Sequence, residues 1–296
     1  MNIIYLLGIL APSFNNNSQL FNNTDFDSGN NADHPIDAKE FSETSISPFY
    51  SCSLRIIDSS FLSLASFQRD DIPEAGGAIF AASSTVDIKS SDDAKECKFS
   101  DNSSPVGGAL ALSCCDTIIK RAKFTNNTAY FAGGAIYVDN MEKLNDPNFQ
   151  IYIFDSNFEN NTAGDDGGAI ACLLLKDCYI DNCGFMANDA KLRGGAIFSE
   201  MTKISIFDSK FDTNTVGKIV NSKQDTAKYY DATNNKKYLE DYSYHFRGRG
   251  GAAIYFQGSK SNETTASLYT QNTCFRDNQA YRGTNLAEKC KDPAII

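Results

Sequence analysis

One position of this sequence carries carboxylates repeatedly, and paired carboxylates are the groups that cleave glycosidic bonds. A glycosidase needs two carboxyl groups at a set separation, one as general acid and one as base or nucleophile. A polysaccharide lyase needs a base, often beside a bound cation. Other copies of the position hold arginine or asparagine, so a solvated polar corner explains it more simply. The acids are Asp58, Glu96, Asp155 and Asp208, and the other residues are Arg121, Asn182 and Asn272.

Histidine and metal chemistry have little support in this sequence. The two histidines, His34 and His245, are far apart and suggest neither a zinc site nor a Ser-His pair. Asp70–Asp71 and Asp165–Asp166 lie shortly before glycine-rich blocks, where acidic residues commonly form turns. We therefore predict no catalytic residue, no metal and no cofactor. A polysaccharide lyase or a glycosidase remains the alternative.

The nine cysteines form no Cys-x-x-Cys pair, so neither a zinc ribbon nor a redox motif is supported. Their odd number leaves at least one thiol unpaired within the chain. Two interpretations stay open, because a cysteine can be a small apolar core residue or part of a disulfide. The residues are Cys52, Cys97, Cys114, Cys115, Cys172, Cys178, Cys183, Cys274 and Cys290.

The acidic composition restricts the class of partner. The formal net charge is −10. Nucleic acids and anionic lipids are both bound through basic surfaces, which attract phosphates and displace their counterions. We therefore expect no nucleic-acid partner and no direct lipid binding, which leaves a protein or a glycan.

Two short motifs alternate along the chain and define a repeat of about 26 residues. In four copies, a Gly-Gly-Ala-Ile-like block begins eight or nine residues after the phenylalanine of a Phe-x-x-Asn block. The distance from a glycine block to the following phenylalanine varies more, from 17 to 25 residues. One arc of the unit is therefore fixed and the other accepts insertions. The glycines are Gly76, Gly77, Gly107, Gly108, Gly133, Gly134, Gly167, Gly168, Gly194, Gly195 and Gly251. The second motif is formed by Phe99 and Asn102, Phe124 and Asn127, Phe158 and Asn161, Phe185 and Asn188, Phe211 and Asn214, and Phe275 and Asn278.

The residues before each motif phenylalanine alternate with the period of a β-strand. The second residue before it is small, and the fifth is isoleucine except for Ala94 and Thr270. The residue directly before it is mostly polar. This pattern predicts an all-β fold, a right-handed parallel β-helix (a solenoid) of about seven coils. A long loop is inserted before the last coil.

Each repeat position has an expected role in that solenoid. The phenylalanines should stack inside, and each asparagine should lie at a bend and bond to the asparagine of the next coil. The second glycine of each block should point inward, where the absence of a Cβ permits a tight bend or close packing against the opposite wall.

The alternation of Gly-Gly-Ala-Ile with Phe-x-x-Asn, from residue 56 to about 283, resembles the repeat of the polymorphic outer membrane protein family. That Pmp-like family is best known from chlamydial autotransporters, and similar repeats occur in surface proteins of some parasitic protists. The resemblance implies a β-helical domain that is exposed at a cell surface and associated with adhesion or host contact.

Four segments are expected along the chain. Residues 1–11 are a candidate signal segment, with a truncated or wrongly assigned start as the alternative, because no Lys or Arg precedes the apolar run. Residues 12–50 are an Asn/Ser-rich leader or an N-terminal cap. Residues 51–285 form the β-helix, and 286–296 a C-terminal tail.

The longest insertion lies between Phe211 and Gly251 and concentrates aromatic and arginine side chains, the residue types that dominate binding hot spots. The loop either packs these aromatics over the flank of the coils or forms a partner-binding surface. The candidate contact residues are Tyr229, Tyr230, Tyr238, Tyr242, Tyr244, Arg247 and Arg249.

Together these observations predict a non-catalytic, extracellular protein, either at the cell surface or secreted. A stiff scaffold with variable loops suits adhesion or contact with a host or the environment. The expected partner is a protein or glycan on another surface, and the oligomeric state is left open.

Overall fold

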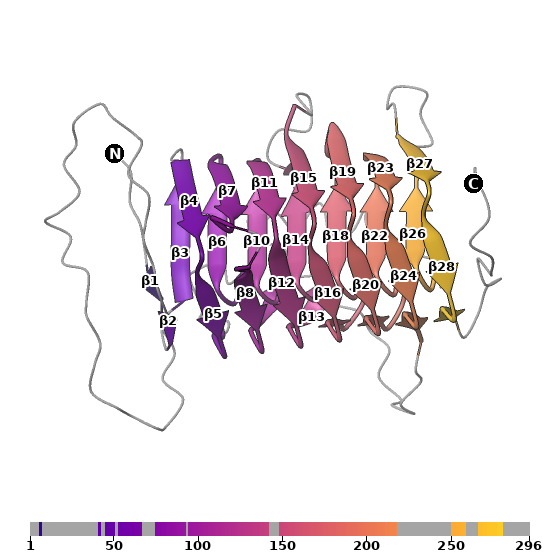
Figure 1. Ribbon diagram of the computed structural model, residues 1–296, viewed down its shortest axis with the longest axis horizontal. Helices are drawn as coiled ribbons and strands as arrows, with labels where there is room; N and C mark the ends of the chain where they lie inside the picture. The colour runs from indigo at the N-terminus through magenta and orange to yellow at the C-terminus, as the bar shows by residue number, and fades with distance from the viewer. Residues whose placement is uncertain are drawn as a thin grey trace, which may run out of the picture.

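The structure is a computed structural model that describes residues 6–7, 41–42, 45–50, 53–66, 75–92, 94–141, 148–217, 250–258 and 266–280. Among these residues the regular elements are β-strands, and they stack along one axis (Figure 1). The candidate signal segment, the leader and the C-terminal tail fall almost wholly outside the described residues.

The strands form four sheets that run along the whole stack. Sheet A contains β1 (Leu6–Leu7), β3 (Ser45–Tyr50), β6 (Ile79–Ala82), β10 (Leu110–Ser113), β14 (Ile136–Asp139), β18 (Ile170–Leu173), β22 (Ile197–Glu200) and β26 (Ile254–Gln257). Sheet B contains β4 (Ser53–Ile57), β7 (Thr85–Lys89), β11 (Asp116–Lys120), β15 (Gln150–Phe154), β19 (Asp177–Asp181), β23 (Lys203–Phe207) and β27 (Ser267–Gln271).

The other two sheets are built from shorter strands. Sheet C contains β2 (Phe41–Ser42), β5 (Ser60–Leu62), β8 (Cys97–Ser100), β12 (Ala122–Thr125), β16 (Asn157–Glu159), β20 (Gly184–Met186), β24 (Lys210–Asp212) and β28 (Cys274–Arg276). Sheet D contains β9 (Ser103–Val106), β13 (Thr128–Ala132), β17 (Thr162–Ala163), β21 (Asp189–Ala190), β25 (Thr215–Val216) and β29 (Gln279–Ala280).

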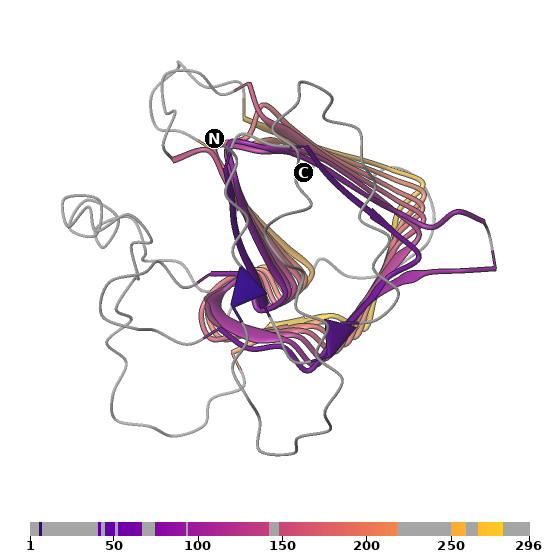
Figure 2. The same ribbon diagram turned by 90° about the vertical axis from the view of Figure 1, so that its left-hand side faces the viewer.

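The chain visits sheets A, B, C and D in turn, and each visit adds one coil to the stack. Every strand pairs in parallel with its neighbours in the adjacent coils, except β1, which pairs antiparallel with β3. Along the axis the coils superpose into a single outline (Figure 2). The predicted parallel β-helix is therefore confirmed, with seven coils in the described part. Strand β3 precedes residue 51 and already pairs in parallel with β6.

The motif phenylalanines form one continuous stack inside the solenoid, as predicted. Consecutive rings lie 4.6–5.0 Å apart between centroids and within 14° of parallel. This spacing is that of neighbouring β-strands, about 4.7–4.9 Å, so parallel in-register pairing alone positions the rings. The stack extends the predicted set by Phe61. Phe61 and the rings from Phe99 to Phe211 are at most 1% exposed, and Phe275 ends the stack.

The motif asparagines form a second internal ladder, also as predicted. The Asn127 Nδ2 group donates to Asn161 Oδ1 at 2.9 Å and to the Phe99 carbonyl oxygen at 2.9 Å. The backbone N–H of Asn127 donates to the same Asn161 Oδ1 at 3.0 Å. At the last step, Asn214 Nδ2 donates to Asn278 Oδ1 at 2.8 Å. The same bonds between neighbouring amides link all members of the ladder, which are Asn102, Asn127, Asn161, Asn188, Asn214 and Asn278.

The asparagine ladder satisfies polar groups that the solenoid buries. Asn214 is fully buried, and its backbone N–H also donates to Asn278 Oδ1, at 2.9 Å. Its Nδ2 group donates to the Phe185 carbonyl oxygen at 3.0 Å. Each such group would cost about 1–3 kcal/mol if it were left without a partner.

The two glycines of each block are required for different reasons. The first has φ between 61° and 70°, which favours glycine. The second was expected to point inward and to permit a tight bend or close packing against the opposite wall, and the close contact that it makes is with the next coil. A Cβ on Gly134 would lie 2.0 Å from the carbonyl oxygen of Gly168. Ala252 occupies the equivalent position in the last described coil, where no described coil follows.

One expected repeat position is corrected by the strand register. Ile88, not Ala94, pairs with Ile119 of the next coil. Cys97 pairs with Ala122, so residues 91–96 are an insertion at the corner between β7 and β8. Glu96 therefore does not belong to the position that Asp58 and Asp155 share. Counting back from the phenylalanine failed because the insertion lies within the counted residues.

The described cysteines support both interpretations that the sequence left open. Cys97, Cys114, Cys115, Cys172, Cys178 and Cys183 are buried and form no disulfide, whereas Cys274 is disulfide-bonded. Burial raises the pKa of the Cys183 thiol to about 12. Inside the solenoid these thiols act as small apolar residues.

Candidate functional site

The acidic position that suggested glycosidase chemistry is a structural corner. Asp58, Asp155 and Asp208 have φ of 48°, 49° and 45°. Asparagine and aspartate tolerate this left-handed conformation better than most residues. Arg121, Asn182 and Asn272 adopt it in other coils, with φ of 53°, 51° and 50°. The shared residue types thus follow from backbone geometry.

These corner residues also bond to one another across coils. Asn182 Nδ2 donates to Asp155 Oδ1 at 2.8 Å, and Asn272 Nδ2 donates to Asp208 Oδ1 at 3.1 Å. The exposed corner is therefore a polar ladder on the outside of the solenoid, which agrees with a solvated corner.

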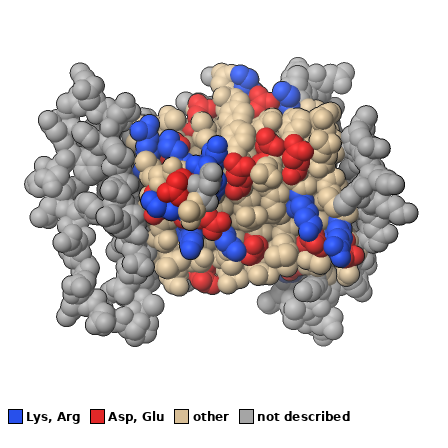
Figure 3. All heavy atoms as spheres, in the orientation of Figure 1, with Lys and Arg blue, Asp and Glu red and all other residues tan. Residues whose placement is uncertain are grey.

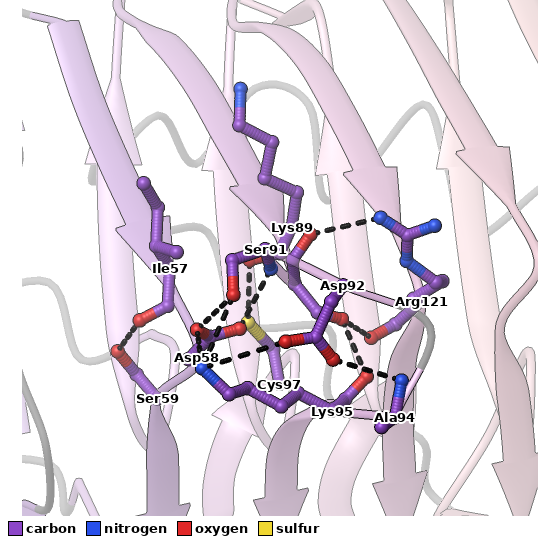
Figure 4. Close-up of polar contacts among 11 residues, drawn as sticks. Ile57, Asp58, Ser59, Lys89, Ser91, Asp92, Ala94, Lys95, Cys97 and Arg121 are labelled. Carbon is purple, nitrogen blue, oxygen red and sulfur yellow. Dashed lines mark hydrogen bonds and ion pairs between the residues drawn. The ribbon is translucent and has the colours of Figure 1, made fainter.

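Asp58 also binds residues of the insertion at 91–96, which forms a corner of the next coil (Figure 4). Its carboxylate accepts hydrogen bonds from the Ser91 backbone N–H at 2.7 Å and from Ser91 Oγ at 2.5 Å. Lys95 Nζ adds an ion pair at 2.9 Å. The Ser91 hydroxyl, the Ser91 N–H and then Lys95 lower the pKa of Asp58 to about 2. The cluster is exposed and explains how the insertion is anchored.

The outer face of sheet B carries a feature that the repeat did not predict. Five aromatic side chains project from strands β15, β19, β23 and β27 and contact one another. Tyr179 lies 5.1 Å from Phe207 and 5.7 Å from Phe154 between ring centroids. All five are partly or largely exposed, and Tyr269 is 45% exposed. We call Tyr152, Phe154, Tyr179, Phe207 and Tyr269 the outer aromatic strip.

Two unneutralised carboxylates border the strip. Asp181 pairs in register with Phe154 on one side and Phe207 on the other, and Asp208 directly follows Phe207. Among the described residues neither forms a salt bridge, in contrast to Asp177, which pairs with Lys203 at 2.8 Å. Burial, together with the charges of Asp181 and Asp208, raises the pKa of Tyr179. Asp181 and Asp208 therefore place negative charge next to Tyr179.

The charged side chains are unevenly spread over this face. In Figure 3, Lys and Arg gather over the N-terminal coils at the left, and further Lys and Arg lie along the upper edge and at the lower right. Uncharged surface with acidic groups lies between them. On the N-terminal coils many of the charges are paired, for example Arg55 and Lys89 with Asp87 at 3.3 and 2.7 Å.

A buried cation lies beside sheet A and was also missed. Arg193 Nε and Nη2 donate to the two carboxylate oxygens of Asp166 at 2.8 and 2.5 Å. The Arg193 guanidinium carbon lies 4.4 Å from the Phe198 ring centroid and 5.3 Å from that of Tyr255. Asp166 and Arg193 each directly precede a glycine block. Because equivalent positions of successive coils lie side by side, this shared position could have predicted their pairing.

The candidate partner-binding loop cannot be placed in this arrangement. Tyr229, Tyr230, Tyr238, Tyr242, Tyr244, Arg247 and Arg249 all lie outside the described residues. The same is true of His34, His245 and Asp70–Asp71. The contact role of that loop remains a prediction from the sequence.

Within the described ranges, no three His, Cys, Asp or Glu side chains group closely enough to hold a metal ion. The same ranges contain no helix whose length and hydropathy would let it cross a bilayer.

Comparison with known proteins supports the repeat assignment. Residues 122–139 and 155–173 match the profile of the Chlamydia polymorphic membrane protein repeat. Each segment runs from a Phe-x-x-Asn block through the next glycine block, so the predicted resemblance is confirmed in two successive coils. No curated protein and no solved structure matches the sequence significantly.

Proposed function

We propose that this chain is a non-catalytic surface or secreted protein that makes contacts with another cell or a host surface. The observation that carries the proposal is that the inner residues of the coils form the scaffold while outer residues stay exposed. Two internal ladders hold a stiff rod, while aromatic side chains on the outer face of sheet B remain accessible. Exposed aromatic patches of this kind mark interaction sites. The repeat match is consistent with a role at the cell surface.

Cell attachment tests the proposal directly. The purified full-length chain, immobilised on beads, should retain host or neighbouring cells more strongly than beads coated with an unrelated protein of equal charge. A chain in which residues 218–247 are replaced by a short glycine linker separates the loop from the rod. Full attachment by this folded variant would show that the loop is not the recognition element. Absence of attachment by the parent would contradict the contact function.

The enzyme alternative is tested with the same preparation. Acidic polysaccharides incubated with the chain should keep their length and reducing-end content. If the chain instead cleaves them and Asp155→Asn abolishes cleavage, the corner carboxylates are catalytic and the proposal is wrong.

A further inference from the structure

The outer aromatic strip combines exposed ring faces with unneutralised negative charge. Phe154 and Phe207 flank Asp181 in strand register, and the Tyr179 ring contacts both of those rings. The rings stand at 30–45° to one another, so ring faces as well as edges are presented to solvent. Aromatic faces attract cations, and carboxylates add direct charge attraction.

The protein already shows which group fits this set of side chains. Beside sheet A, the Arg193 guanidinium lies against two stacked rings and is held by the carboxylate of Asp166 from the adjacent coil. Phe198 and Tyr255 are 5.7 Å apart between centroids, close to the 5.1 Å between Tyr179 and Phe207. The outer strip thus offers the rings and the carboxylate of that arrangement, without a salt-bridged cation.

We propose that the outer aromatic strip docks a basic, arginine-containing segment of a partner protein. Asp181 and Asp208 supply the complementary charge, and Tyr179 and Phe207 supply the ring faces. The choice of a protein partner rests on the proposed contact function, whereas the recognition chemistry rests on the strip itself. An uncharged glycan would use the rings but would gain less from the two carboxylates.

Binding of defined peptides to the full-length chain tests this proposal. The probe is a fluorescent hexapeptide, Gly-Arg-Gly-Arg-Gly-Arg, measured by anisotropy at physiological salt. Its control contains citrulline, in which an uncharged urea replaces each guanidinium. We expect the arginine peptide to bind and the citrulline peptide to bind at least about tenfold more weakly. Equal binding of the two peptides would overturn the proposal.

Variants locate the site on the surface. Tyr179→Ala, Phe207→Ala and Asp181→Asn should each weaken arginine-peptide binding about two- to fivefold. Asp101→Asn, which removes the same charge at an exposed corner of another face, should change it less than about 1.5-fold. Circular dichroism confirms that each variant is folded. An equal loss in Asp101→Asn and Asp181→Asn would show diffuse charge attraction and would contradict docking at the strip.

The remaining outcomes separate the two proposals. If an uncharged oligosaccharide such as chitohexaose binds in a Tyr179-dependent manner and the arginine peptide does not, the strip is a glycan site and our inference is wrong. The arginine peptide could bind at the strip while Tyr179→Ala leaves cell attachment intact. That result would support docking at the strip and would contradict a role of the strip in cell attachment.

Discussion

The solenoid builds two aromatic ladders from the same coils, one inside and one outside. The inner phenylalanines stack within 14° of parallel and are almost fully buried. The outer rings lie 5.1–6.4 Å apart, most of them tilted by 30–47°, and they remain partly exposed. The coil that contains β15 and β16 contributes to both ladders, through Phe154 and Phe158, which are four residues apart.

The difference in ring orientation shows that coil stacking constrains the inner rings much more than the outer ones. Inside, neighbouring coils and the opposite wall leave one ring orientation, and a smaller residue would open a cavity. Outside, water replaces one side of each ring, so the orientation is loose and the residue type is not imposed. An aromatic strip confined to four coils is therefore an addition to the scaffold rather than a requirement of it.

The glycine position is where the scaffold should be most sensitive. Gly134→Val would force a branched side chain against the carbonyl oxygen of Gly168, which lies 2.0 Å from the Cβ position, and we expect no folded protein. Gly258→Val is the matched control, because among the described residues a Cβ at Gly258 would meet only the Ala266 Cβ, at 4.0 Å. Thermal melting of both variants checks this. Similar melting temperatures would show that the coils are not tightly stacked at Gly134.

The asparagine ladder should be the next most sensitive feature. Asn161→Ala removes the acceptor for two Asn127 N–H groups and the donors to Phe124 and Asn188. Each buried group left unsatisfied costs about 1–3 kcal/mol, so we expect a loss of at least about 2 kcal/mol. Urea unfolding measures it, with Asn157→Ala, on the exposed face of β16 in the same coil, as the control. A loss below about 0.5 kcal/mol would mean that water replaces the amide.

Outer corners should matter least, and Asp58 provides a pH test. Its pKa of about 2 lies below the ordinary 3.8, so its contacts stabilise the fold above about pH 4. That contribution disappears as the pH falls toward 2. NMR titration should give a midpoint near 2, and Ser91→Ala should move it upward. An unshifted midpoint in Ser91→Ala would show that the hydroxyl does not bond to Asp58.

The repeat determined what could be predicted from the sequence. The inner position of Phe158 is phenylalanine in all seven described coils and that of Asn161 is asparagine in six of them, and this recurrence revealed their direction and partners. The outward position of Tyr179 is tyrosine in only three coils, and the position of Asp181 varies from coil to coil, so the motifs that define the repeat did not include the strip. The outward positions flanking Ile180 in β19 would have revealed it had they been compared across coils as the inward ones were.

Two other features were missed for local reasons. Counting residues from Phe99 placed Glu96 in the corner position, because sequence distance cannot show the insertion at 91–96 that register exposes. Asp166 was interpreted as a turn residue and its pairing with Arg193 was missed, because burial of both side chains depends on coil stacking. The predicted loop contacts, including Tyr229 and Arg249, lie outside the described residues and stay predictions.

The central claim is that the inner ladder holds the fold while the outer strip is free to bind, and one paired measurement tests it. Phe154→Ala and Phe158→Ala make the same chemical change in the same coil, and urea unfolding gives the stability of each. We expect Phe158→Ala to lose about 3–5 kcal/mol and Phe154→Ala about 1 kcal/mol or less. Equal losses, or the larger loss at Phe154, would contradict the division between scaffold and surface.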